Sequence, residues 1–205
     1  MALSPAFNAT VPPSSHRGQN AYAQHFDHGL DRMDLHQHLR LMADYHYWAL
    51  QRLYAEVDEL SDDDYRADCG QFFKSIHGTL NHILLAEQIW QARMAGTPHS
   101  FTRLDQEIES DRDKLRDHML AFCRGWRPFV DKLTPEQVAG DLDYLNLKGE
   151  PFTMPFASLV LHVFNHATHH RGQASIGLMH FGRPAPVMDL PYFLIGLPRE
   201  RLHAP

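Results

Sequence analysis

The sequence predicts an all-α domain, a four-helix bundle that carries a short β-hairpin between its third and fourth helices. Apolar residues recur at three- and four-residue steps in four long stretches, which is the period of an amphipathic helix. One short stretch before the last of them alternates apolar and polar residues, which is the period of a strand. Four amphipathic helices in one small domain favour a bundle, because each must bury its apolar face against the others.

The chain of 205 residues is long enough for one domain, and 43% of its residues are hydrophobic, which is enough to form a buried core. Residues 1–31 are rich in Ser, Pro, Asn, Gln and His and show neither period, so we expect an N-terminal extension there. The bundle domain is then expected to cover residues 32–205.

Each element has its own signal. Gly96 and Gly182 follow the second and fourth apolar stretches, where helices commonly end. Pro128 should kink the third helix. Lys148-Gly149-Glu150 reads as the turn of a hairpin over residues 140–155. We therefore expect helices over residues 34–60, 72–94, 104–133 and 156–181, with one further helical turn at 191–195.

Charge and cysteine content limit the class of function. The formal net charge of −6 argues against a nucleic-acid-binding protein, which normally presents a basic surface. No apolar run approaches the roughly 20 residues that span a bilayer, and the N-terminus lacks the pattern of a secretory signal. Cys69 and Cys123 give no disulfide framework. We therefore expect a cytoplasmic protein that binds neither nucleic acid nor membranes.

The most informative stretch is residues 158–173, which holds His162, His166, His169 and His170. A helix advances about 100° per residue, so His166 and His170 lie about 40° apart on a face that is otherwise apolar. Two imidazoles at this spacing can bind one metal ion. His162 and His169 fall at the edge of that face. The alternative is that both inward histidines are ordinary hydrogen-bonded core residues, and a third ligand from another helix would argue against it.

Two other helices each turn a histidine inward. His82 shares a face of the second helix with Thr79 and Ala86, whereas His77 points about 140° away and is expected to face solvent. His46 lies in the middle of the apolar stripe of the first helix, where an unpaired imidazole would be costly. It therefore either reaches the metal pocket or hydrogen-bonds a buried partner, and we favour the pocket.

Several motifs resemble those of the DinB family, whose members are described as metalloenzymes. The resemblance covers roughly residues 36–195, and the fourth-helix motif is the most specific. At position 46 relatives often carry Asn, so the resemblance implies no role for His46. The motifs are Tyr45-His-Tyr-Trp48, Leu80-Asn-His-Ile-Leu84 with Trp90, Phe164-Asn-His-Ala-Thr-His-His-Arg-Gly-Gln173, and Pro186-Val-Met-Asp-Leu-Pro-Tyr192.

The resemblance implies a four-helix bundle, commonly dimeric, with a metal held by three histidines that correspond to His82, His166 and His170. It also implies a relation to enzymes that use low-molecular-weight thiols such as mycothiol, bacillithiol or glutathione for transfer, isomerisation or conjugation. We accordingly expect a homodimer, and Trp48 and Tyr54, which lie off the core stripe, are candidates for its interface.

Three imidazoles leave a divalent ion with an open position, as in catalytic sites. We expect zinc or nickel, with iron or copper as alternatives. The leading hypothesis is an enzyme whose metal activates a small-molecule thiol for S-transfer or conjugation to an electrophilic substrate. In this hypothesis the substrate-binding residues are His46, Trp90, His162 and Gln173.

Two other functions remain open. One is a metal-dependent hydrolase that uses metal-bound hydroxide as its nucleophile. The other is a non-catalytic metal-binding protein of the stress response. Arg171 could meet the carboxylate of a thiol, but its helical phase favours solvent or an interface.

Overall fold

The computed structural model describes residues 33–197, so the expected N-terminal extension lies outside the described residues. Within the described part the chain is mainly helical with one two-stranded sheet, which confirms the predominantly helical class. The elements are α1 (Leu35–Val57), α2 (Asp62–Arg66), α3 (Ile76–Met94), α4 (Arg112–Arg124), α5 (Trp126–Asp131), α6 (Pro135–Ala139), β1 (Asp141–Leu145), β2 (Pro151–Pro155), α7 (Phe156–His180) and α8 (Leu190–Ile195).

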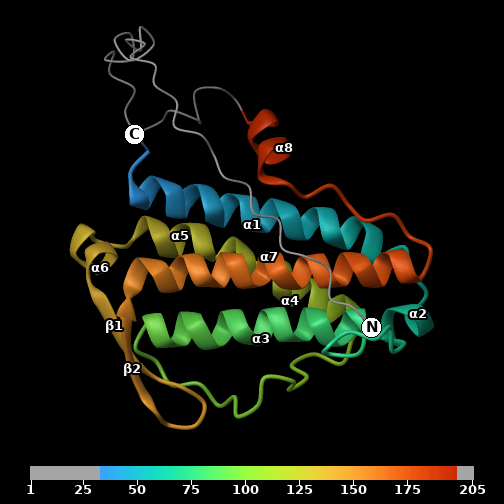
Figure 1. Ribbon diagram of the computed structural model, residues 1–205, viewed down its shortest axis with the longest axis horizontal. Helices are drawn as coiled ribbons and strands as arrows, with labels where there is room; N and C mark the ends of the chain where they lie inside the picture. Colours follow the sequence, from blue (N-terminus) through green and yellow to red (C-terminus); the bar gives the residue numbers. More distant parts are fainter. Residues whose placement is uncertain (1–32, 198–205) are drawn as a thin grey trace, which may run out of the picture. The chain divides into compact units, whose positions relative to one another are not determined.

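The three longest helices lie side by side, with α7 between α1 and α3 (Figure 1). A capping box formed by Asp34 and Gln37 starts α1, and the Ser75 hydroxyl, which accepts from the backbone N–H of Gly78, starts α3. Helices α4 and α5 pack against α1, and α4 also contacts α3. Two large apolar clusters fill the space between these helices; their fully buried members include Leu50, Leu53, Leu80 and Leu84 in one and Trp126 and Phe164 in the other.

The prediction of a third helix over residues 104–133 is wrong for its first part, which forms a loop. Its second part forms two helices, α4 and α5, instead of one. Residues 101–111 form a loop along α3, and the buried side chain of Asn81 binds the backbone of this loop at residues 108 and 109. Its Oδ1 accepts from the N–H groups of Ile108 and Glu109 at 2.8 and 3.0 Å. Asp111 then caps α4.

Helix α4 ends before α5 begins, and the break falls at Gly125. Pro128 explains its position, since a proline ring clashes with the carbonyl four residues earlier, here that of Arg124, the last residue of α4. Pro128 was expected to kink one long helix; in the structure the chain forms two separate helices at this point.

The hairpin expected over residues 140–155 is confirmed. Strands β1 and β2 pair antiparallel, with Asp141 opposite Pro155 and Leu145 opposite Pro151. The Asn146 side chain accepts from the N–H groups of Lys148 and Glu150, and Gly149 adopts φ +79°, which a residue with a Cβ rarely adopts.

The two aromatic residues that suggested an interface are accounted for within the chain. Tyr54 is only 3% exposed. The ring of Trp48 lies 5.6 Å from that of Phe193 in α8, which packs against α1. Neither side chain therefore requires a partner subunit to cover it.

Candidate metal centre and its pocket

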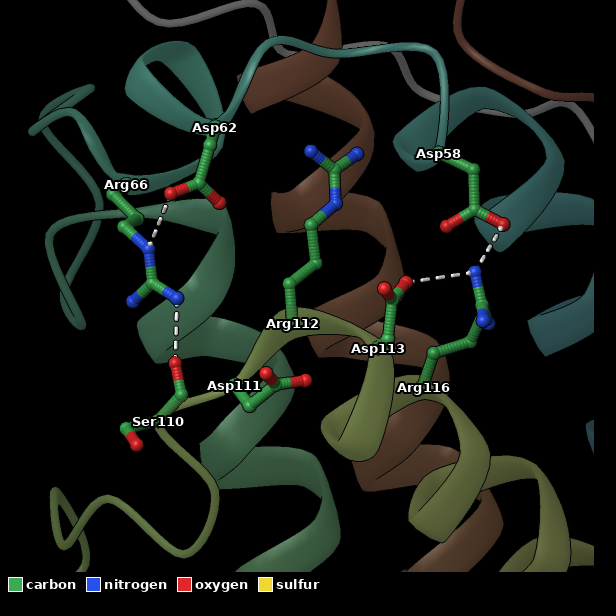
Figure 2. A pocket seen from close by; sticks show the side chains of 8 residues that line it. All are labelled: Asp58, Asp62, Arg66, Ser110, Asp111, Arg112, Asp113 and Arg116. Atoms are coloured by element: carbon green, nitrogen blue, oxygen red, sulfur yellow. Dashed lines mark hydrogen bonds and ion pairs between the residues drawn. The ribbon is translucent and has the colours of Figure 1, made fainter.

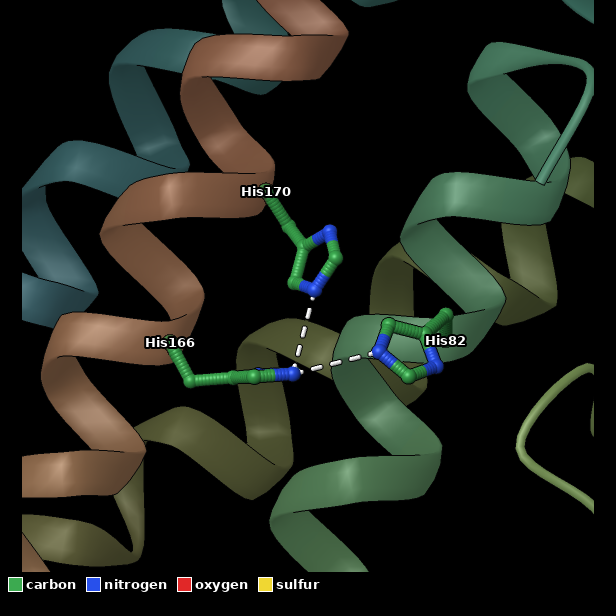
Figure 3. A group of neighbouring side chains, drawn as sticks. All are labelled: His82, His166 and His170. Carbon is green, nitrogen blue, oxygen red and sulfur yellow. Dashed lines mark hydrogen bonds between the residues drawn. The ribbon is translucent and has the colours of Figure 1, made fainter. Parts of the chain in front are cut away.

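Three histidines from two helices bring their Nε2 atoms together. His82 comes from α3, and His166 and His170 lie one turn apart on α7 (Figure 3). The Nε2 of His166 is 3.2 Å from that of His82 and 3.1 Å from that of His170. The fold therefore brings together the three histidines that helical phase predicts to face inward.

Hydrogen bonds at the far side of two rings fix which nitrogen carries the proton. The Nδ1 of His82 faces the carbonyl of Leu104 at 2.8 Å, and the Nδ1 of His170 faces Oε1 of Gln173 at 2.7 Å. Gln173 Nε2 lies 3.1 Å from His169, which orients the amide with its oxygen toward His170. Both Nδ1 atoms must therefore donate, and in the neutral rings both Nε2 atoms present lone pairs.

The donor set then fits a divalent cation better than it fits a hydrogen-bonded cluster. His166 Nε2 can donate one proton to only one of its two neighbours, so at least one lone pair stays unsatisfied. A cation satisfies all three. Two nitrogens that are each about 2.1 Å from one ion lie roughly 3.0–3.4 Å apart at octahedral or tetrahedral angles, which matches the observed separations.

Burial keeps these imidazoles neutral. It lowers the pKa of His166 to about 3, with further lowering by the neighbouring histidines. It also lowers the pKa of His170 to about 4, although the hydrogen bond that His170 donates to Gln173 acts in the opposite direction. The pKa of His82 is likewise lowered by burial. Neutral imidazole is the form that binds metal, so protons compete little at neutral pH.

A pocket of about 610 Å³ opens over the three histidines. Trp90, His162 and Gln173, which were expected to bind substrate, all line it. Phe73 stacks on His82 with ring centroids 3.9 Å apart and shields that side of the centre. The lining residues are Phe72, Phe73, His82, Ala86, Ile89, Trp90, Arg93, Leu104, Asn146, Leu147, Lys148, His162, His166, His169, His170 and Gln173.

His46 does not line this pocket, which corrects the expectation that it binds substrate there. Its ring is fully buried among α1, α3 and α7. Its Nε2 donates to Glu87 Oε1 at 2.9 Å, and its Nδ1 accepts from Arg171 at 2.7 Å. Of the two environments considered for His46, the structure shows the hydrogen-bonded one.

Glu87, His46 and Cys123 form a second group with metal-ligating atoms close together, but its hydrogen bonds are complete. Glu87 accepts from His46, from Cys123 at 3.3 Å and from the indole N–H of Trp126 at 2.9 Å. Burial raises the pKa of Glu87, but His46 and these donors outweigh it, and the net effect lowers that pKa. Because hydrogen bonds within the protein satisfy these polar atoms, the closeness of the three side chains requires no metal.

Two other expectations about orientation are wrong. Arg171 is 1% exposed and lies in the core, where it bonds His46 and the hydroxyl of Thr168, so it faces neither solvent nor the pocket. His77 is also buried, between the hydroxyl of Tyr65 and the carboxylate of Glu107. Helical phase gives the direction of a side chain but not which other segment covers it.

Sequence reasoning missed four residues that surround the three histidines, line their pocket or bind His46. The carbonyl of Leu104 belongs to a loop where the sequence predicts a helix, and Phe73 precedes α3. Arg93 and Glu87 had a usable signal: Arg93 lies on the same face of α3 as His82, and Glu87 is a carboxylate inside the apolar run Ile83–Trp90.

A second cleft lies between the end of α1, α2 and the start of α4 (Figure 2). Most of its charged groups pair with one another, and Arg112 donates to the backbone carbonyls of Leu60 and Val57. Arg66 bonds Asp62, and Arg116 bonds both Asp58 and Asp113. The cleft is therefore explained as a network of surface ion pairs.

No helix within residues 33–197 is long and apolar enough to cross a membrane.

Comparison with known proteins gives the same identification as the motifs. The model of the DinB family matches residues 33–200. Protein DinB of Bacillus subtilis (strain 168) is 24% identical to this chain over 164 residues, which cover 77% of this chain and 94% of that protein. The family match spans the whole described region, including both helices that carry the three histidines. The chain therefore belongs to the DinB family.

Proposed function

We propose that this protein is a metal-dependent enzyme in which His82, His166 and His170 hold a divalent ion, with zinc or nickel expected and iron or copper as alternatives. We interpret the packing of α1, α3, α4 and α7 as the four-helix bundle that supports the site. The observation that carries the proposal is the convergence of three Nε2 atoms, two with their proton fixed on Nδ1, at the wall of a pocket.

The reaction we propose is the activation of a low-molecular-weight thiol for S-transfer or conjugation to an electrophilic substrate. A divalent ion beside a bound thiol favours its deprotonation, so that the nucleophilic thiolate is present at neutral pH. Three protein ligands leave room for such a small molecule, whereas structural sites are normally closed by four.

The chain's own residues would divide the remaining tasks. Phe73 and Trp90 offer apolar surface that excludes water and orients the substrate. The ring of His162 lies 5.6 Å from that of His166 and 5.2 Å from that of Trp90, and burial lowers its pKa. It is therefore neutral at pH 7 and placed to accept the proton of an incoming thiol.

The test uses protein purified without a metal-affinity tag, stripped with a chelator and reloaded with zinc or nickel. We expect the reloaded protein to accelerate conjugation of glutathione to 1-chloro-2,4-dinitrobenzene, and the stripped protein and His166→Ala not to. His180→Ala, an exposed histidine at the end of α7, is the matched control. No acceleration with glutathione, cysteine or N-acetylcysteine against several electrophiles would count against thiol transfer.

Two alternatives are separated in the same assay. Turnover of p-nitrophenyl acetate without added thiol, lost in His166→Ala, favours a metal-dependent hydrolase; with His46 buried elsewhere, His162 is the residue left to act as its base. Metal bound at one equivalent with no activity in either assay favours a non-catalytic metal-binding protein of the stress response.

The homodimer is a second proposal that concerns assembly. Ile176 and Met179 are 67% and 61% exposed, and they share one face of α7 because they are three residues apart. Light scattering at micromolar concentration tests it, and Ile176→Asp with Met179→Asp should give a monomer. A wild-type monomer would contradict it.

A further inference from the structure

The pocket over the three histidines is electrostatically one-sided. None of the sixteen described residues that line it is acidic, and two of them, Arg93 and Lys148, are basic. Arg93 comes from the last turn of α3, and Lys148 from the tip of the hairpin. Two cations that share a largely apolar pocket with no carboxylate leave a positive potential for a ligand to neutralise.

Arg93 has no anionic or hydrogen-bonding partner among residues 33–197. Its Nε is shielded from solvent and makes no hydrogen bond. Every other described arginine except Arg52 donates at least one side-chain hydrogen bond. The guanidinium carbon of Arg93 instead lies 4.7 Å from the ring centre of Trp90 and 4.9 Å from that of Tyr144. The rings hold the guanidinium beside the pocket without using its donors.

The positions along α3 define the length of the ligand. His82, Ala86, Trp90 and Arg93 follow one another at four-, four- and three-residue steps and so share one face. Eleven residues of helix separate the Cα atoms of His82 and Arg93 by about 16 Å along the axis. Because the guanidinium leans back over Trp90 by about one turn, a molecule that reaches from it to the histidines is on the order of 10 Å long.

We propose that this pocket binds an extended organic anion with an apolar body, whose terminal oxyanion is held by Arg93 and Lys148 and whose other end lies at His82, His166 and His170. The fork of donors on a guanidinium matches a carboxylate or phosphate group. Ile89 and Trp90 line the pocket together with Phe73, which stacks on His82, and these side chains contact the apolar body. The inference rests on the proposed function in one respect only: it names the substrate class of the same site.

The competing explanation is that Arg93 is only a brace between α3 and β1 through the rings of Trp90 and Tyr144. A brace predicts that changing Arg93 lowers stability without changing which ligands bind. An anion site predicts a change in ligand preference. The two explanations therefore differ in a binding measurement.

The experiment is isothermal titration of the metal-loaded protein with three probes of similar shape: 2-naphthoate, 2-naphthyl phosphate and the neutral 2-naphthamide. We expect at least one anion to bind about tenfold or more tightly than the amide, a preference that added salt weakens. The two anions distinguish a carboxylate from a phosphate ligand. Equal affinity for all three probes would overturn the inference.

Substitutions test whether Arg93 and Lys148 cause the preference for anions over the neutral amide. Arg93→Gln should remove most of it while the bound metal stays at the wild-type level, and Arg93→Lys should retain part. Lys148→Gln, at an exposed turn where folding is not at risk, should reduce it independently. Arg103→Gln, an arginine outside the pocket that is paired with Asp105, is the control and should leave it unchanged.

Repeating the titration with metal-stripped protein separates this site from the metal. A preference that persists without metal supports the arginine and lysine as its source, and one that disappears on stripping overturns the inference, since the metal is then the anion's partner. If the anion preference is present but no thiol is transferred, the proposed reaction fails and the inference stands. If thiol is transferred without any anion preference, the proposed reaction stands and the inference fails.

Discussion

The Nε2 atom of His46 lies 2.9 Å from Oε1 of Glu87, and the two side chains are 0% and 1% exposed. The bond joins α1 to α3, and Arg171 reaches the other nitrogen of the same ring from α7. One imidazole therefore links the three longest helices, two of which also carry His82, His166 and His170. Such a buried polar network is stable only while each member keeps its partners.

Replacing Glu87 by Gln should destabilise the fold more than an ordinary polar substitution. The change removes the buried negative charge that balances Arg171 and turns one acceptor into a donor that faces His46, Cys123 or Trp126. Breaking a buried charged pair in this way costs about 3 kcal/mol or more. Urea unfolding measures the loss. The control is Glu59→Gln, which changes a solvent-exposed carboxylate and should alter the free energy of unfolding by no more than about 0.5 kcal/mol. Equal effects of the two substitutions would show that the network contributes nothing.

His46→Ala and His166→Ala should separate stability from metal binding. His46 touches no part of the pocket, so His46→Ala should retain metal near the wild-type level while it loses about 2–4 kcal/mol of stability. His166→Ala should lose the metal, with a smaller effect on the stripped protein. Elemental analysis of untagged protein and urea unfolding make the comparison. Loss of metal in a folded His46→Ala variant would show that the two clusters act as one site.

Gln173→Leu tests whether the amide orients a ligand. Its Oε1 accepts from His170 Nδ1, and residues in this position typically change metal affinity by about 10–100-fold when they are removed. We expect a weaker zinc affinity of that order, measured by competition with a chelating dye, and an unchanged stoichiometry. Gln51→Leu, on the exposed surface of α1, is the control. An unchanged affinity in Gln173→Leu would assign Gln173 to the pocket wall alone.

The sequence was sufficient for the parts of the molecule that local periodicity determines. Helical phase predicted that His82, His166 and His170 face the interior together, and the alternation after Gly140 predicted the hairpin. Both signals depend only on neighbours within one element. The family motifs added the assignment of the three histidines as a metal site.

The errors arose where distant segments decide the outcome. The amide of Asn81, buried in α3, holds residues 108 and 109 in a loop although their apolar spacing continues a helical pattern. The inward phase of His46 predicts a position in the pocket, but Glu87 and Arg171, 41 and 125 residues away in sequence, surround it. Nothing in a local window reports which partners tertiary packing will supply.

Asn81→Ala should release the loop that Asn81 holds. The substitution leaves two backbone N–H groups without their acceptor, at a cost of about 2–3 kcal/mol. The amides of Ile108 and Glu109 should exchange with deuterium faster than in the wild type. Because the carbonyl of Leu104 in the same loop orients His82, zinc affinity should fall as well. Asn165→Ala, at an exposed position of α7, is the control, and unchanged exchange at residues 108 and 109 would contradict the role of Asn81.

The metal-stripped protein should lose stability as the pH is lowered below about 6.5, the ordinary histidine pKa in an unfolded chain. In the folded chain burial and neighbouring histidines lower the pKa of His166 to about 3, and burial lowers that of His170 to about 4. Between these values the unfolded chain binds protons at both rings and the folded chain does not. The free energy of unfolding therefore rises with pH in this window, and the stability is lost as pH falls from 6.5 toward 4.

Urea unfolding at pH 7, 6 and 5 measures this slope, and His166→Gln with His170→Gln isolates the contribution of the two rings. Other histidines with a lowered pKa, such as His77 and His162, remain in both proteins, so the difference between the two slopes belongs to the pair. We expect the double variant to be the less pH-dependent protein. Equal slopes would mean that the two rings titrate normally and that the fold does not hold them neutral for a metal.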